Sequence, residues 1–156
     1  MDRHSIRYHF SSIKAIASVV GLICIGQLYS GAAMATGSVL PITNVDNQAN
    51  HELSRQALRS IYSMRTQSWP DGQRLVVFVL EDDADLHSDF CQTILGVLPY
   101  QLRRSWDRLI FSGRASAPIV VANVEEMKRR VAETNGSLGY LSANQIDDSI
   151  AVVGVK

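Results

Sequence analysis

Short apolar runs alternate with helix-like repeats of apolar residues along the chain from Val39 onward. Four of the runs have the length and composition of strands, and the list is short: Val39–Thr43, Leu75–Leu80, Leu138–Leu141 and Ile150–Val155. The run Leu75–Leu80, with the sequence LVVFVL, contains no polar residue. Strands that are buried on both faces of a sheet have this composition, so we expect a central strand there.

Between these runs, apolar residues recur three or four positions apart, which predicts helices. We expect Ser54 to cap the first helix. The second helix ends at Gly96 and the third is entered through Pro99. Asn123 and Glu126 are spaced as a capping box for the last helix. The expected buried faces are Leu58, Ile61 and Tyr62; Phe90, Cys91, Ile94 and Leu95; Leu102, Trp106, Leu109 and Ile110; and Val124, Met127 and Val131.

The alternation of strands and helices predicts an α/β fold built in layers. The segment Trp69–Gly72 (WPDG) predicts a turn before the central strand, because proline sets the first corner and Asp-Gly tolerates the second. The chain has 156 residues, of which 46% are apolar. That length fits one domain, and that apolar share is sufficient for a packed core.

The first 35 residues differ from the rest and predict a secretory signal peptide. Arg3, Arg7 and Lys14 precede an apolar stretch, and Ala33-Met34-Ala35 matches an A-x-A cleavage site. The apolar stretch is shorter than the roughly 20 residues that cross a bilayer. We therefore expect cleavage after Ala35, a mature domain over residues 36–156 and a periplasmic location. An uncleaved membrane anchor is the alternative.

The mature chain would carry 12 basic and 14 acidic residues, because Arg3, Arg7, Lys14 and Asp2 leave with the signal peptide. The resulting net charge of −2 is not that of a nucleic-acid-binding protein. Its single cysteine, Cys91, is expected to be a small buried residue on a helix. No catalytic triad, pair of catalytic carboxylates, metal cluster or cofactor motif is recognisable, so the sequence does not indicate an enzyme.

The order of the landmarks resembles the short phosphate ABC transporter substrate-binding-like proteins of bacterial envelopes. The resemblance covers about residues 39–155. Its landmarks are Leu53-Ser54, the WPDG turn, Ile94-Leu95-Gly96, the segment from Trp106 to Gly113, and Asn135–Tyr140 (NGSLGY). It implies a periplasmic-binding fold of type 2 in reduced form, a single-lobe α/β three-layer sandwich. Two-lobed members close on their ligand, whereas one lobe offers half a cleft.

The resemblance also implies phosphate or another oxyanion as the ligand, held by backbone N–H groups, hydroxyls and an arginine. The family's Ser/Gly/Thr-rich loop after the central strand corresponds here to Glu81–Ser88, which has four carboxylates and no arginine. Those charges disfavour a dianion. The candidate ligand residues are Ser88, His87 and Arg114.

Each candidate has a plainer interpretation. Ser88 also fits a helix N-cap, His87 a surface side chain and Arg114 a solvated arginine. Asp82, Asp83 and Asp85 are expected in a solvated loop, and a Ca²⁺ or Mg²⁺ site formed by Glu81, Asp83 and Asp85 is the alternative. The helical stripe of Arg103, Arg104 and Arg108 is expected to face water, where it could dock an acidic partner, and Trp69 and Trp106 are expected in the core.

Two functional hypotheses follow. The first is an exported solute-binding-like protein, related to phosphate transport receptors, whose partner would be a transporter. The second is an envelope module that keeps the fold and binds another protein. The family resemblance favours the first hypothesis, and the acidic loop favours the second.

Overall fold

The computed structural model describes residues 37–47, 52–114 and 116–156. The expected signal peptide, residues 1–35, lies outside the described residues. The strands are β1 (Val39–Asn44), β2 (Glu52–Leu53), β3 (Val76–Val79), β4 (Ile119–Val120), β5 (Ser137–Ser142), β6 (Ile150–Val152) and β7 (Gly154–Val155). The helices are α1 (Arg55–Tyr62), α2 (Asp85–Asp89), the π-helix η1 (Phe90–Leu95), α3 (Pro99–Phe111), α4 (Val124–Glu133) and the short 3₁₀ helix η2 (Ala143–Gln145).

Five strands form the main sheet in the order β4-β3-β5-β1-β6. Strand β3 runs parallel to both of its neighbours, β4 and β5. Strand β1 is antiparallel to β5, with Leu40 opposite Leu141, and antiparallel to β6. The central strand predicted from LVVFVL is therefore confirmed, since β3 has a partner on each side and Val77, Phe78 and Val79 are buried.

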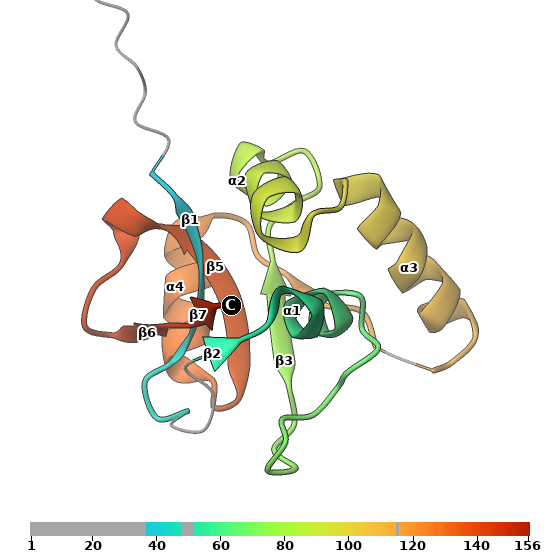
Figure 1. The fold of residues 1–156 in the computed structure, drawn as a ribbon, viewed down its shortest axis with the longest axis horizontal. Coiled ribbons are helices and arrows are strands. Elements are labelled where there is room, and N and C mark those ends of the chain that lie inside the picture. Colours follow the sequence, from blue (N-terminus) through green and yellow to red (C-terminus); the bar gives the residue numbers. More distant parts are fainter. Residues whose placement is uncertain (1–36, 48–51, 115) are drawn as a thin grey trace, which may run out of the picture. The chain divides into compact units, whose positions relative to one another are not determined.

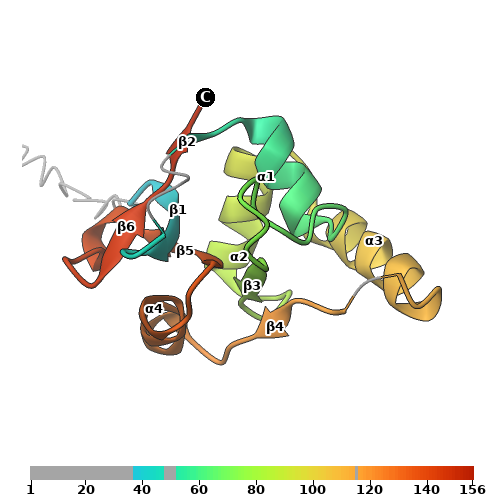
Figure 2. The ribbon, with the colours of Figure 1, turned by 90° about the horizontal axis from the view of Figure 1, so that it is seen from below.

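Helices cover both faces of the sheet, which gives the predicted three layers (Figures 1 and 2). In Figure 2, α4 lies on one side of the strands, while α1 and α2 lie on the other. The core between the layers contains both tryptophans, as predicted. The indole N–H of Trp106 donates to the carbonyl of Tyr62 (2.6 Å), and that of Trp69 donates to the carbonyl of Gly136 (3.0 Å).

Local side-chain chemistry places most helix ends where the sequence indicates. The Ser54 hydroxyl accepts the N–H of Ala57, and the Asn123 side chain accepts the N–H of Glu126. Gly96 ends η1 in the left-handed region with φ 64°, which suits glycine. The N-cap prediction for Ser88 is wrong. Helix α2 begins earlier, at Asp85 with Ala84 at the N-cap position, so Ser88 lies inside the helix.

Several features have no clear signal in the sequence. Strand β4 is only two residues long and both of them are exposed, so it lacks the pattern of a buried strand. The predicted strand Ile150–Val155 divides at Val153, whose N–H donates to the carbonyl of Pro41. The part after the break, β7, pairs with β2 in a separate two-stranded sheet.

Among the described residues, none of the helices combines the length and the apolar character that crossing a membrane requires.

Candidate functional site

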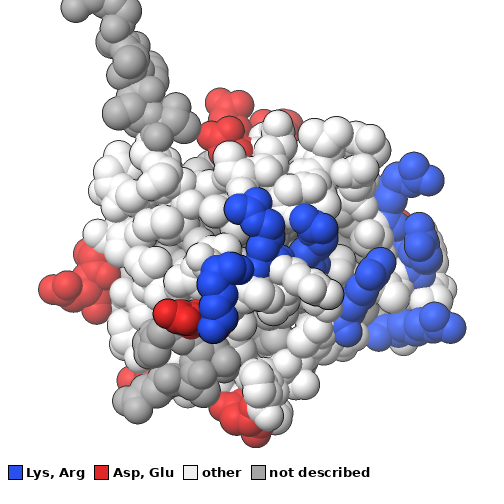
Figure 3. All heavy atoms as spheres, viewed as in Figure 1, with Lys and Arg blue, Asp and Glu red and all other residues white. Residues whose placement is uncertain are grey.

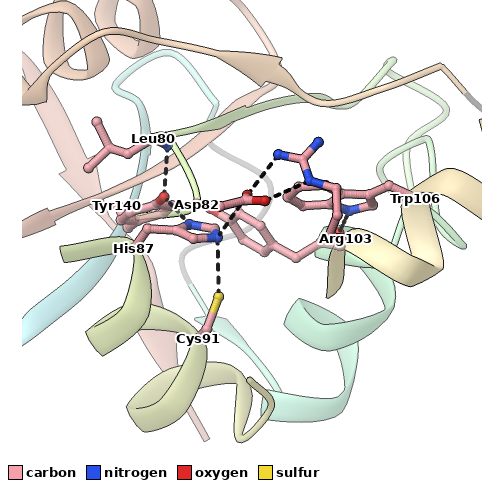
Figure 4. Close-up of polar contacts among 8 residues, drawn as sticks. Leu80, Asp82, His87, Cys91, Arg103, Trp106 and Tyr140 are labelled. Atoms are coloured by element: carbon pink, nitrogen blue, oxygen red, sulfur yellow. Dashed lines mark hydrogen bonds and ion pairs between the residues drawn. The ribbon is translucent and has the colours of Figure 1, made fainter. Parts of the chain in front are cut away.

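An ion pair joins the loop after β3, where the family resemblance places anion binding, to helix α3 (Figure 4). Both oxygens of the Asp82 carboxylate accept hydrogen bonds from the Arg103 guanidinium of α3, from Nε and Nη2, each at 2.7 Å. The guanidinium also lies over the Trp106 ring, 4.8 Å from its centroid. In this pair, the Asp82 carboxylate occupies the two guanidinium N–H donors that an oxyanion from solution would otherwise bind. Both side chains stay partly exposed, as expected, but the sequence did not indicate that they pair with each other.

Below the ion pair lies a buried histidine. His87, expected at the surface, is 0% exposed. Its Nδ1 lies 2.6 Å from the hydroxyl of Tyr140, which is on β5. The same hydroxyl accepts the backbone N–H of Leu80 at 2.9 Å. The surface interpretation fails because α2 turns this side of the helix toward the sheet, where Tyr140 supplies the polar partner that a buried ring requires.

These contacts favour one tautomer of the imidazole. The Tyr140 oxygen already accepts from Leu80, so its single hydrogen is free to be donated to Nδ1 of His87. The ring proton then resides on Nε2. That atom faces the Cys91 sulfur at 3.5 Å and Oδ1 of Asp82 at 4.0 Å. Figure 4 shows Tyr140, Cys91 and Asp82 around the ring, contributed by β5, η1 and the loop.

The electrostatics of the cluster keep its buried members uncharged. Burial lowers the pKa of His87, an effect that the Asp82 carboxylate opposes and the Arg103 guanidinium reinforces. Burial raises the pKa of the Cys91 thiol to about 12, and burial also raises the pKa of Tyr140. The hydrogen bond from Arg103 lowers the pKa of the Asp82 carboxyl. At neutral pH the cluster therefore contains one ion pair above a neutral histidine, thiol and phenol.

This arrangement is not that of an activated thiol. In a nucleophile–histidine–carboxylate triad, the nucleophile and the carboxylate contact different nitrogens of the ring. Here Cys91 and Asp82 both face Nε2, and Tyr140 occupies Nδ1. The thiol is also 0% exposed, so a substrate has no access to it. In the described part of the chain, no group of three His, Cys, Asp or Glu side chains is placed to share a metal ion.

The structure separates the three predicted ligand residues. His87 lies in the buried cluster, and Ser88 lies half-buried on α2, where its hydroxyl accepts from Gln92. Arg114 is exposed beyond the end of α3, which extends roughly 12 Å along its axis after Arg103. Their role in ligand binding stays a prediction.

Sequence reasoning missed the partners of His87. A signal for its burial was present, because His87 and Cys91 are four residues apart and so share a helical face that adjoins Phe90. The contact with Tyr140 had no local signal, since the two residues come together only through the packing of α2 on β5.

Comparisons with known proteins identify the fold. No protein-family model matches the sequence, and a search of curated proteins gives no match. Among solved structures, an ABC-type phosphate transport receptor from Vibrio cholerae superposes with a TM-score of 0.59 at 18% identity, over 76% of this chain and 46% of that one. A phosphate ABC transporter substrate-binding protein from Clostridium perfringens, solved with bound phosphate, gives 0.59 at 20% identity, over 76% and 44%. PstS from Borrelia burgdorferi gives 0.54 at 14% identity, over 76% and 47%.

The fold is that of phosphate-binding proteins of ABC transporters, as the resemblance in the sequence predicts. The chain spans less than half the length of these receptors, and its described part has the architecture of a single lobe.

Proposed function

We propose that this chain is an exported single-lobe binding module of the cell envelope, which keeps the solute-binding fold but works by contacting another protein. It does not act as a phosphate receptor on its own, and it is not an enzyme. The observation that carries this proposal is the bidentate ion pair between Asp82 and Arg103, which places an internal carboxylate on a cation that contacts the loop.

The charges around the ion pair support the same conclusion. Glu81, Asp83 and Asp85 are exposed on the same loop. Each would repel an incoming dianion by about 1 kcal/mol per pair of unit charges at 4 Å, even in water. His87 cannot offset this repulsion, since burial lowers its pKa and leaves the ring neutral at pH 7. A phosphate ion would therefore meet four carboxylates and one arginine that is already paired.

The size of the chain supports a protein partner. A chain that spans 46% of the Vibrio cholerae receptor offers one wall of a cleft and leaves an anion hydrated on the other side. A second surface is needed to remove that water. A partner protein in the envelope, such as a transporter subunit, would supply it.

Isothermal titration of the purified protein with inorganic phosphate tests this proposal. We expect a Kd above about 1 mM, which corresponds to less than roughly 4 kcal/mol. The Clostridium perfringens protein, which was solved with phosphate, is a suitable positive control. Micromolar binding by the wild-type chain would overturn the proposal. A gain in affinity in Asp82→Asn, with the wild type remaining weak, would support competition from the internal carboxylate.

Export has its own test. The proposal requires that the protein recovered from the periplasm begin at Thr36, as N-terminal sequencing would show. Recovery of the full-length chain in the membrane fraction would favour the anchored alternative.

A further inference from the structure

A second polar surface, which neither Asp82 nor Arg103 lines, is an open groove bordered by α1 and α3. Its volume is about 750 Å³, and no carboxylate of the described residues lines it. Figure 3 shows Lys and Arg side chains gathered over this face, with Asp and Glu mainly toward its edges. The residues that line the groove are Arg55, Gln56, Arg59, Ser60, Ser63, Arg65, Val97, Gln101, Leu102 and Ser105.

Two of the three arginines are held in place without being neutralised. Nη1 of Arg55 donates to the carbonyl of Thr93, and Nε of Arg59 donates to the carbonyl of Leu95, both at 2.8 Å. These carbonyls lie at the end of η1, where helix C=O groups lack intrahelical partners. Within the described residues, Arg55, Arg59 and Arg65 make no ion pair, unlike Arg103. Their charges and their remaining N–H groups are therefore available to a ligand.

The spacing of these groups fits an extended chain of carboxylates. Arg55 and Arg59 are four residues apart on one helix, so they are separated by about 6 Å along the axis. Alternate side chains of an extended peptide lie on one side about 6.6 Å apart. The amides of Gln56 and Gln101 both donate and accept hydrogen bonds, as a peptide backbone requires. A second pocket of about 250 Å³ shares Val97 and Gln101 with the groove and so extends it.

We propose that this groove binds an extended acidic peptide segment, with carboxylates at alternate positions paired to Arg55 and Arg59. The proposal deepens the function suggested above by naming the surface and the chemistry of the protein partner. A single phosphate ion would leave most of a 750 Å³ groove unfilled, which favours the longer ligand. The mature chain would carry a net charge of −2, so the basic groove is a local exception that would orient an acidic partner.

Fluorescence anisotropy with a labelled ten-residue peptide of alternating Glu and Ser tests the proposal. We expect the full protein to bind this probe at low ionic strength and to lose affinity as salt is added. The double variant Arg55→Gln/Arg59→Gln should weaken binding by at least about tenfold, as one pair or more is lost. Arg55→Lys/Arg59→Lys keeps the charges and should retain most of the affinity.

The matched control is Arg74→Gln/Arg129→Gln, which removes the same charge from two exposed arginines that do not line the groove. An equal loss in this control would mean that bulk charge binds the probe, and would overturn the proposal. Three other results would also overturn it: no binding of the Glu-Ser peptide, equal binding of a Lys-Ser peptide, or displacement of the probe by low-millimolar phosphate. The melting temperature of each variant identifies loss of fold. The phosphate titration described above is independent, so the groove can fail while the proposed function survives.

Discussion

The hydroxyl of Tyr140 lies 2.6 Å from Nδ1 of His87 and accepts the backbone N–H of Leu80 from the other side. One oxygen atom therefore joins β5, α2 and the end of β3. The loop that carries Asp82 starts directly after Leu80, so this contact fixes where the loop begins and, with it, the position of the carboxylate that pairs with Arg103.

Removing this oxygen should destabilise the protein. Tyr140→Phe leaves the N–H of Leu80 and Nδ1 of His87 buried without a partner, and an unsatisfied buried group costs about 1–3 kcal/mol. Urea unfolding followed by circular dichroism would measure the loss. The matched control is Tyr100→Phe, because Tyr100 is 57% exposed and should change stability little. Equal stabilities of the two variants would contradict the role assigned to the hydroxyl.

Stability should fall in two steps as the solution is acidified. The folded pKa of His87 is lowered, so the unfolded chain binds more protons, and stability is lost as pH falls below about 6.5, the ordinary histidine value. The folded pKa of Asp82 is also lowered, which adds a second loss below about pH 4.

Melting temperatures of the wild type and His87→Gln between pH 7.5 and 5 separate the first step. The variant should be nearly insensitive to pH in this range, although the other three of the four histidines remain in the chain. An unchanged pH dependence in His87→Gln would assign the first step to another group.

The ion pair between Asp82 and Arg103 should contribute modestly to stability, since both side chains are more than a third exposed. A double-mutant cycle with Asp82→Asn and Arg103→Gln should give a coupling of about 0.5–1 kcal/mol. Repeating the unfolding measurements at high salt should reduce the coupling. A coupling near zero would show that the bidentate geometry is not maintained in solution.

The central strand should be the most sensitive part of the core. Phe78 is 1% exposed on β3, and the guanidinium of Arg130 on α4 lies 5.4 Å from its ring centroid. Phe78→Ala should cost about 3–5 kcal/mol. Val120→Ala on the neighbouring β4, where the side chain is 40% exposed, is the matched control. A melting temperature that Phe78→Ala leaves unchanged would contradict the burial of β3.

Sequence reasoning succeeded where the signal is local. The LVVFVL run, the caps Ser54 and Asn123 and the stop at Gly96 each depend on residues within one turn or strand, and each is confirmed. The burial of His87 depends instead on Tyr140, which is distant in the sequence. Strand β4 is defined by its neighbour β3 and not by its own exposed residues.

The site was harder to predict than the fold for the same reason. From the sequence, Asp82 and Arg103 each fit an unpaired side chain in water. Only the approach of α3 to the loop makes them a pair. From the sequence, Arg55 and Arg59 fit the solvent-exposed face of a helix. Only the packing of η1 and α3 near α1 places them in a groove.

The position of β1 in the sheet has a consequence for biosynthesis. It is the first described strand to leave the ribosome, yet its partners β5 and β6 are among the last, with Leu40 opposite Leu141. The sheet cannot close until β5 and β6 have been synthesised, because such distant pairings form late and slowly. A nascent chain of this topology therefore stays open until its last described strands have been made, and an open chain is what the export proposed above requires.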